Sequence, residues 1–106
     1  MLANWCCIMT REYLIRPNES EWFDLHKVNF SEVFRPSNFE SEPIRGWDEH
    51  RIKIEGIEIS FSYEDPGIQI TFWGEIDGEI ADQIVDEILK NIKKSTEQSG
   101  SVVLLS

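Results

Sequence analysis

Cysteines and long apolar runs are both scarce in this sequence of 106 residues. The only two cysteines, Cys6 and Cys7, are neighbours, and the spacing of about 3.8 Å between successive Cα atoms is too short for an unstrained disulfide. Because no disulfide framework can form, we expect a protein of the reducing cytoplasm. The apolar runs extend over only a few residues each, so we expect neither a transmembrane span nor membrane binding.

Basic side chains are absent between Ile54 and Leu89, a stretch that carries ten carboxylates. Residues 54–106 hold eleven acids and three bases, whereas residues 1–53 hold nine acids and seven bases. Nearly all of the formal charge of −10 therefore belongs to one half of the chain. Such a field repels nucleic acid and anionic membranes and attracts a basic protein surface, which is the partner that we expect.

The rest of the composition is that of a folded domain. A hydrophobic fraction of 41% and four Trp exclude an acidic disordered tail, and the length suits one core. We predict a single α+β domain over residues 11–106. Residues 1–10 are predicted to be a flexible N-terminal extension, with a small apolar anchor as the alternative.

Two apolar stretches alternate with polar residues around a turn sequence, Glu64-Asp65-Pro66-Gly67. Pro fixes φ and Gly accepts a positive φ, so these four residues suit a turn. The spacing predicts an antiparallel hairpin, 57–63 with 68–73, in which Glu58 faces Trp73. The apolar residues that then share one face are Ile57, Ile59, Phe61, Tyr63, Ile68, Ile70 and Phe72.

An earlier strand is predicted over residues 51–55, but Ile52 and Ile54 are in the opposite phase from Ile57. Gly56 marks the change of phase, which either a bulge or a tight turn can produce. We favour one long bent strand over a separate hairpin.

An amphipathic helix is predicted over residues 78–94, with Asp77 as its N-cap. Asp82 and Glu87 fall on the solvated face, so we expect their replacement by Ala to have little effect on stability. A short final strand is predicted over residues 102–105. The apolar residues that recur at helical spacing are Ile80, Ala81, Ile84, Val85, Ile88, Leu89 and Ile92.

The first half of the chain is less regular. We predict a strand at residues 13–15 and an irregular connection over residues 35–46. Between them we predict a helix that begins near Glu21, with apolar members Trp22, Phe23 and Leu25 and later Phe30, Val33 and Phe34. Together the elements predict an α+β fold. A small antiparallel sheet is built on the hairpin, and the C-terminal helix packs on one of its faces.

Asp48, Glu49 and His50 form the densest group of functional side chains. Two carboxylates beside an imidazole are able to bind a metal or perform acid–base chemistry. Three consecutive side chains point in different directions, however, and no second Cys/His group or nucleophile motif accompanies them. We therefore expect no catalytic residue, no metal and no cofactor, and interpret the group as the polar approach to a strand.

Trp73 is the main candidate for partner binding. In the predicted register it projects from the same side of the hairpin as Glu58 and Glu75, and an exposed indole among carboxylates suits an interface anchor. The equal alternative places Trp73 in the core, beneath the helix of the first half. With Asp82 from the helix, the predicted partner-binding residues are Trp73, Glu58, Glu75 and Asp82.

Three short motifs resemble small bacterial immunity proteins of polymorphic toxin systems. They are Gly46-Trp47-Asp48-Glu49-His50, Ile52-Lys53-Ile54 and Asp65-Pro66-Gly67. Some of those proteins have a Trp-acidic-His group, then an I-x-I strand and an Asp-Pro-Gly turn. The three motifs lie within residues 46–67, a segment that covers about a fifth of the chain, and the resemblance assigns no functional residue. It implies an acidic single-domain protein that neutralises a basic toxin.

Three functional hypotheses follow. The leading one is a cytoplasmic, non-enzymatic protein, such as an immunity protein or inhibitor, that docks a basic partner through its acidic half. The second is a structural or assembly subunit that self-associates through the sheet or through the strand at residues 102–105. The third is a small metal-dependent hydrolase built on Asp48, Glu49 and His50. The sequence leaves the identity of the partner and the oligomeric state open.

Overall fold

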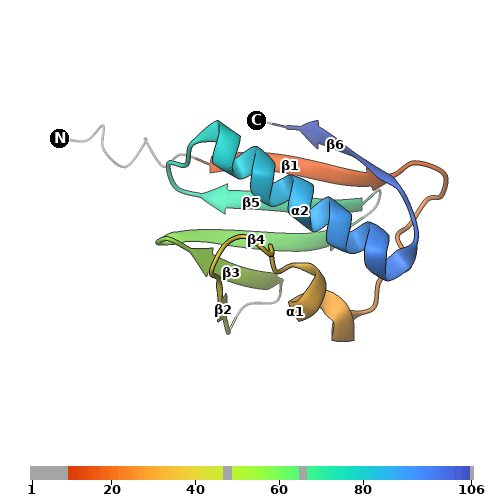
Figure 1. Cartoon of the computed structure of the whole chain (residues 1–106), viewed down its shortest axis with the longest axis horizontal. Coiled ribbons are helices and arrows are strands. Elements are labelled where there is room, and N and C mark those ends of the chain that lie inside the picture. Colours follow the sequence, from red (N-terminus) through yellow and green to blue (C-terminus); the bar gives the residue numbers. More distant parts are fainter. Residues whose placement is uncertain (1–9, 47–48, 65–66, 106) are drawn as a thin grey trace.

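A six-stranded antiparallel sheet is the centre of the part of the chain that the computed structural model describes, residues 10–46, 49–64 and 67–105. The strands lie in the order β2-β3-β4-β5-β1-β6 (Figure 1). The strands are β1 (Thr10–Pro17), β2 (Glu42–Ile44), β3 (His50–Ile54), β4 (Ile57–Glu64), β5 (Gly67–Trp73) and β6 (Gly100–Leu104). The helices are η2 (Lys27–Asn29, a 3-10 helix), α1 (Phe30–Val33) and α2 (Gly78–Thr96).

The predicted hairpin is confirmed as β4 and β5. The two strands pair from Glu58 opposite Trp73 to Glu64 opposite Gly67, in the predicted register. Alternation then places the apolar residues of both strands on one face, where Ile59, Phe61, Ile68, Ile70 and Phe72 are all buried. Asp65 and Pro66, at the centre of the predicted turn, lie outside the described residues.

The expected long bent strand over residues 51–63 is wrong, because β3 and β4 are separate strands. They form a second hairpin, in which Ile54 pairs with Ile57 across a two-residue turn. Glu55 and Gly56 both have positive φ, +48° and +83°, as the commonest two-residue hairpin turn requires. The sequence did not predict a positive φ at Glu55, because residues other than Gly, Asn and Asp seldom adopt that conformation.

The C-terminal helix is confirmed as α2, which extends two residues beyond the predicted end, to Thr96. Asp77 is its N-cap, and the Asp77 carboxylate accepts hydrogen bonds from the backbone N–H groups of Glu79 and Ile80. The residues of α2 that are buried against the sheet are Ala81, Ile84, Val85, Ile88 and Ile92. The final strand is also confirmed, as β6.

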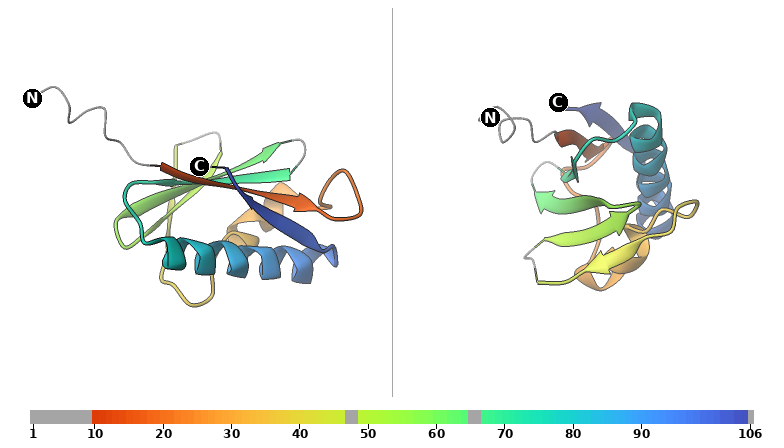
Figure 2. Two further views of the ribbon diagram at one scale, coloured as in Figure 1. Left: turned by 90° about the horizontal axis from the view of Figure 1, so that it is seen from above. Right: turned by 90° about the vertical axis from the view of Figure 1, so that its left-hand side faces the viewer.

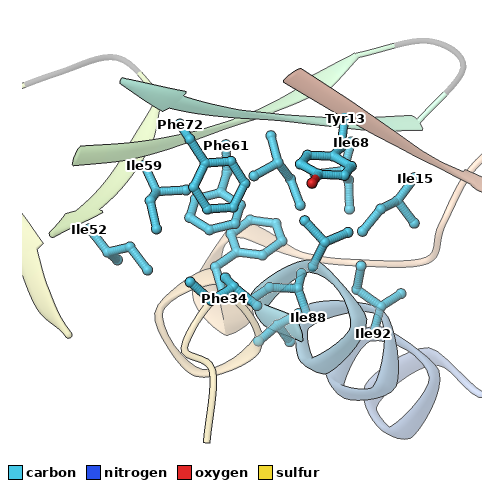
Figure 3. Packing of buried hydrophobic residues seen from close by; sticks show 14 of the residues in the cluster. Tyr13, Ile15, Phe34, Ile52, Ile59, Phe61, Ile68, Phe72, Ile88 and Ile92 are labelled. Atoms are coloured by element: carbon cyan, nitrogen blue, oxygen red, sulfur yellow. The ribbon is translucent and has the colours of Figure 1, made fainter. Parts of the chain in front are cut away.

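Both α-helices lie on the same face of the sheet, and no helix covers the other face of the described structure (Figure 2). The core lies between the sheet and α2, with Phe34 inserted beside Ile88 (Figure 3). The Phe34 and Phe61 rings are stacked, with centroids 4.4 Å apart and planes 4° from parallel. We call the uncovered side the open face.

No helix of the described residues is long and apolar enough to span a bilayer.

The predicted helix from Glu21 is wrong in its first part, because the helical residues begin only at Lys27; Phe30 and Val33 are helical, in α1. Before that point Trp22 and Asp24 are exposed while Phe23 and Leu25 are buried, an alternation that suits an extended chain. Long-range hydrogen bonds hold this segment, since Gln98 accepts from the Asp24 backbone N–H and donates to the Trp22 carbonyl.

Two smaller expectations are also revised. The strand expected at residues 13–15 extends over Thr10–Pro17, so Thr10 belongs to the sheet rather than to the predicted extension; residues 1–9 lie outside the described residues. The connection over residues 35–46 contains β2, a three-residue strand at the sheet edge.

The orientation of α2 can be tested by placing a charge in the core. Ile88 has no exposed surface, so Ile88→Asp should destabilise the domain by on the order of 4 kcal/mol and abolish a cooperative melting transition. The matched control is Gln83→Asp, the same new side chain at an exposed position of α2. Circular dichroism on heating compares the two. A native transition in Ile88→Asp would contradict the packing described here.

Candidate functional site

Trp73 lies on the open face, at the end of β5, and is 42% exposed. Trp73 alternates with the buried Phe72 along β5, so it faces away from the helices, which cover the opposite face of the sheet (Figure 2). The indole Nε1–H donates to the Ser60 hydroxyl over 3.0 Å, which fixes the ring across the neighbouring strand. The Arg51 guanidinium carbon lies 5.3 Å from the ring centroid, so one cation already contacts the indole face.

Arg51 connects the indole to two carboxylates on the open face. Its Nη2 lies 2.9 Å from Glu49 Oε1, and its Nη1 lies 3.2 Å from Glu58 Oε1. The Arg51 side chain is only 11% exposed, whereas the Glu58 side chain is 42% exposed. A hydrogen bond from its own backbone N–H and another from Arg51 lower the pKa of Glu49. Two ion pairs therefore hold the Arg51 guanidinium against the indole.

The four predicted partner-binding residues lie on two different surfaces. Trp73 and Glu58 are cross-strand neighbours on the open face. Glu75 is exposed in the connection that follows β5, and Asp82 lies on α2, beyond the opposite face of the sheet. One flat partner surface therefore cannot cover all four residues through the open face alone.

Asp82 has a structural contact that its place on the exposed side of α2 did not indicate. The Tyr13 hydroxyl donates to Asp82 Oδ1 over 2.6 Å, and Arg11 Nη2 lies 3.8 Å from the same oxygen. Burial of the Tyr13 ring, followed by this hydrogen bond, raises the pKa of the Tyr13 hydroxyl. Glu87 likewise accepts from the backbone N–H and the side-chain amide of Asn38. Both carboxylates thus tie α2 to other segments.

Sequence reasoning missed Arg51 and Tyr13 as members of these sites. The alternation of Arg51 with Ile52 in a strand was a usable signal, since it places Arg51 opposite the core and on the same side as Glu49. The contact between Tyr13 and Asp82 joins residues 69 positions apart, so no local pattern indicates it.

Glu49 and His50 lie on opposite faces of the sheet, and Asp48 lies outside the described residues. Glu49 contacts Arg51 on the open face, whereas the His50 ring packs 5.7 Å from Phe34 and 5.9 Å from Phe61 on the core side. Within the described ranges no group of three or more Asp, Glu, His or Cys residues is placed to hold a metal ion. The two side chains therefore contact different groups, although both residues line the cavity beside η2.

His50 also lines a cavity of about 590 Å³ beside η2, with Lys27, Phe30, Glu49 and Tyr63 among the other lining residues. Its Nε2 is buried without a hydrogen-bond partner among the described residues, and burial lowers the pKa of the imidazole. A neutral ring suits its aromatic surroundings.

No family model, no curated protein and no solved structure matches this chain. The resemblance to immunity proteins therefore stays a prediction.

The contact between Asp82 and Tyr13 can be tested on stability. Asp82→Ala leaves a buried hydroxyl without its acceptor and should lower the free energy of unfolding by about 1 kcal/mol, contrary to the small effect expected from the sequence. Asp82→Asn keeps an acceptor and should recover most of this loss. Urea denaturation measures both, and equal stability of Asp82→Ala and the unmutated chain would show that the bond contributes nothing.

His50 should make the fold sensitive to mild acid. Its folded pKa is below the ordinary value of 6.5, so the unfolded chain binds the proton first as the pH falls. This contribution is fully present above about pH 6.5 and is lost as the pH falls through the lowered folded pKa. His50→Phe should flatten the stability profile between about pH 7 and pH 5, and the exposed His26→Asn is the control. Identical profiles for His50→Phe and the unmutated chain would contradict this assignment.

Proposed function

We propose that this chain is a non-enzymatic, cytoplasmic protein-binding domain that docks a basic partner, in the manner of an immunity protein or inhibitor. The observation that carries the proposal is a run of six carboxylates, most of them exposed, from the end of β5 along the first half of α2. We call residues 75–87 the acidic segment. Its carboxylates are Glu75, Asp77, Glu79, Asp82, Asp86 and Glu87, and it contains no base.

The exposure of the acidic segment supports this proposal. Glu75, Glu79, Asp82 and Asp86 are exposed. Two of them form ion pairs, Asp86 with Lys90 of the same helix over 3.1 Å and Asp82 with Arg11 of β1 over 3.8 Å. Surface pairs of this kind are weak and leave the long-range field largely intact. Such a field accelerates the encounter with a basic protein surface.

The open face supports binding by contact rather than by charge alone. Trp73 is held in one orientation by Ser60 and Arg51, so little side-chain entropy is lost when a partner covers it. Trp and Arg are the residue types most enriched among side chains that dominate interface energies. Because Arg51 occupies part of the indole, a partner is expected to pack against the exposed edge of the ring.

The most direct test uses the gene next to the one that encodes this chain. If the neighbouring product is toxic, its expression should arrest growth, and co-expression of this chain should restore growth. The purified proteins should also form a complex of defined stoichiometry in light scattering. A toxic neighbour that this chain neither rescues nor binds would contradict the proposal.

The electrostatic attraction in this proposal predicts that the association rate depends strongly on salt concentration. The association rate constant for the neighbouring product should fall about tenfold or more between about 0.02 M and 0.5 M salt, because screening shortens the range of the attraction. Combined Glu58→Gln, Glu75→Gln and Asp82→Asn substitutions should slow association, with less effect on dissociation. Stopped-flow mixing measures both constants.

A matched control separates local charge from net charge. Glu19→Gln, Glu21→Gln and Glu40→Gln remove three charges from exposed positions of the less acidic half and should slow association less. Trp73→Ala should act in the opposite way, raising the dissociation rate constant about tenfold with little effect on association. An association rate indifferent to salt would reduce the acidic segment to a solubilising surface.

A second candidate function, self-assembly through the sheet, is supported by β6. This strand lies at an edge of the sheet and carries consecutive exposed apolar residues. Light scattering at several protein concentrations distinguishes the two functions, since only self-assembly gives a mass that rises with concentration.

A further inference from the structure

The outer edge of β6 is the least protected edge of the sheet. β6 pairs with β1 on one side, and no described strand pairs with its other side. The opposite edge, β2, has only three residues and includes Glu42 and Pro43, which are common devices against unwanted strand pairing. β6 has five residues, and residues 98–106 contain no charged side chain.

The unpaired backbone groups of β6 can be assigned by residue. The Leu105 N–H donates to the Glu12 carbonyl over 2.8 Å, and the Asn18 N–H donates to the Ser99 carbonyl over 2.9 Å. Backbone groups of successive residues point to alternate sides of a strand, so the odd-numbered residues of β6 face β1. The N–H and C=O groups of Gly100, Val102 and Leu104 therefore point outward, away from the sheet.

The side chains of this edge are apolar on both faces. Val102, Val103, Leu104 and Leu105 are 40%, 42%, 51% and 48% exposed. Val102 and Leu104 lie on the α2 side, since they pair with Ile15 and Tyr13 of the core, and Val103 lies on the open face. Contiguous exposed apolar residues of this kind mark interaction sites.

A groove of about 320 Å³ separates β6 from α2, and its rim is acidic. Tyr13, Val85 and Val102 form its apolar lining, while Asp82 and Asp86 of α2 line it with carboxylates. A strand added outside β6 would place alternate side chains on the α2 side of the sheet, close to these two carboxylates.

Charge decides which occupant suits this edge. A second copy would bring another chain of net charge −10, with its own acidic α2, against the first. An extended segment with apolar side chains on one face and Lys or Arg on the other suits both features. Its backbone can pair with the outward groups of β6, and its basic side chains can lie beside the carboxylates of the groove. We propose that β6 accepts an extended, basic and apolar segment of a partner protein by β-strand addition.

This inference rests on the proposed function and names how the basic partner docks. The added strand forms hydrogen bonds with the outward groups of Gly100, Val102 and Leu104. Its basic side chains lie beside Asp82 and Asp86, and its apolar side chains cover Val103 and Leu105 on the open face.

The test uses two short synthetic peptides that alternate Val or Thr with a charged residue, Lys in one and Glu in the other. The Lys peptide should bind at least about tenfold more tightly than the Glu peptide, and should slow hydrogen exchange at the amides of Gly100, Val102 and Leu104. Nuclear magnetic resonance of the full chain follows these amides individually.

Val102→Pro is the decisive variant, because it removes an outward N–H and none that bonds β1. It should weaken binding of the Lys peptide by about tenfold, while Val102→Thr, which keeps the N–H and the branched shape, should bind normally. Melting curves check that both variants fold. If Val102→Pro does not fold, the amide exchange of the unmutated chain with the two peptides still tests the proposal.

Each other outcome overturns strand addition by a basic segment. No binding of the Lys peptide, equal binding of both peptides, or binding without protection of the three amides would do so. Protection without peptide that rises with protein concentration would assign the edge to a second copy. Protection without peptide that disappears on deletion of residues 1–9 would assign it to that segment. A neighbouring-gene product that binds the unmutated chain and Val102→Pro equally would overturn the inference and leave the proposed function standing.

Discussion

The cross-strand register of β4 and β5 is the constraint on which the rest of the structure depends. It places Ile59 beside Phe72 and Phe61 beside Ile70, so both strands present one continuous apolar face. That face is what the buried side of α2 covers, and Phe34 fills the space that α2 leaves. A shift by one residue would move every one of these side chains to the other side of the sheet. The open face, with Trp73 and Arg51, exists because this register leaves the polar residues there.

Local chemistry accounts for what could be predicted from the sequence. Alternation and a Pro-Gly turn predicted β4 and β5 with their register, and the N-cap Asp77 with the apolar spacing predicted α2. The same register correctly placed Trp73 beside Glu58. The β3–β4 turn was not predicted, because Glu55 adopts a conformation that its residue type disfavours and that the two paired strands stabilise.

The remaining failures share a different cause, which is distance along the chain. Phe23 and Leu25 are buried without a helix because Gln98, far along the sequence, supplies the hydrogen bonds that their segment lacks. The sequence predicts Asp82 as a solvated helix residue, because its hydrogen bond with the distant Tyr13 is not visible in any local pattern. The candidate site was thus predictable where it depends on one hairpin, and unpredictable where it depends on how β1 and α2 meet.

The position of β1 between β5 and β6 has a consequence for how the chain folds as it is made. Among the described strands β1 comes first along the chain, yet it pairs only with β5 and β6, which are synthesised much later, and β6 follows α2. Such pairing has a high contact order, which slows folding. The β3–β4 hairpin can form before β5, the first partner of β1, has been synthesised. Tyr13 and Ile15 therefore lack the neighbours that bury them until β5 and α2 have been added to the nascent chain.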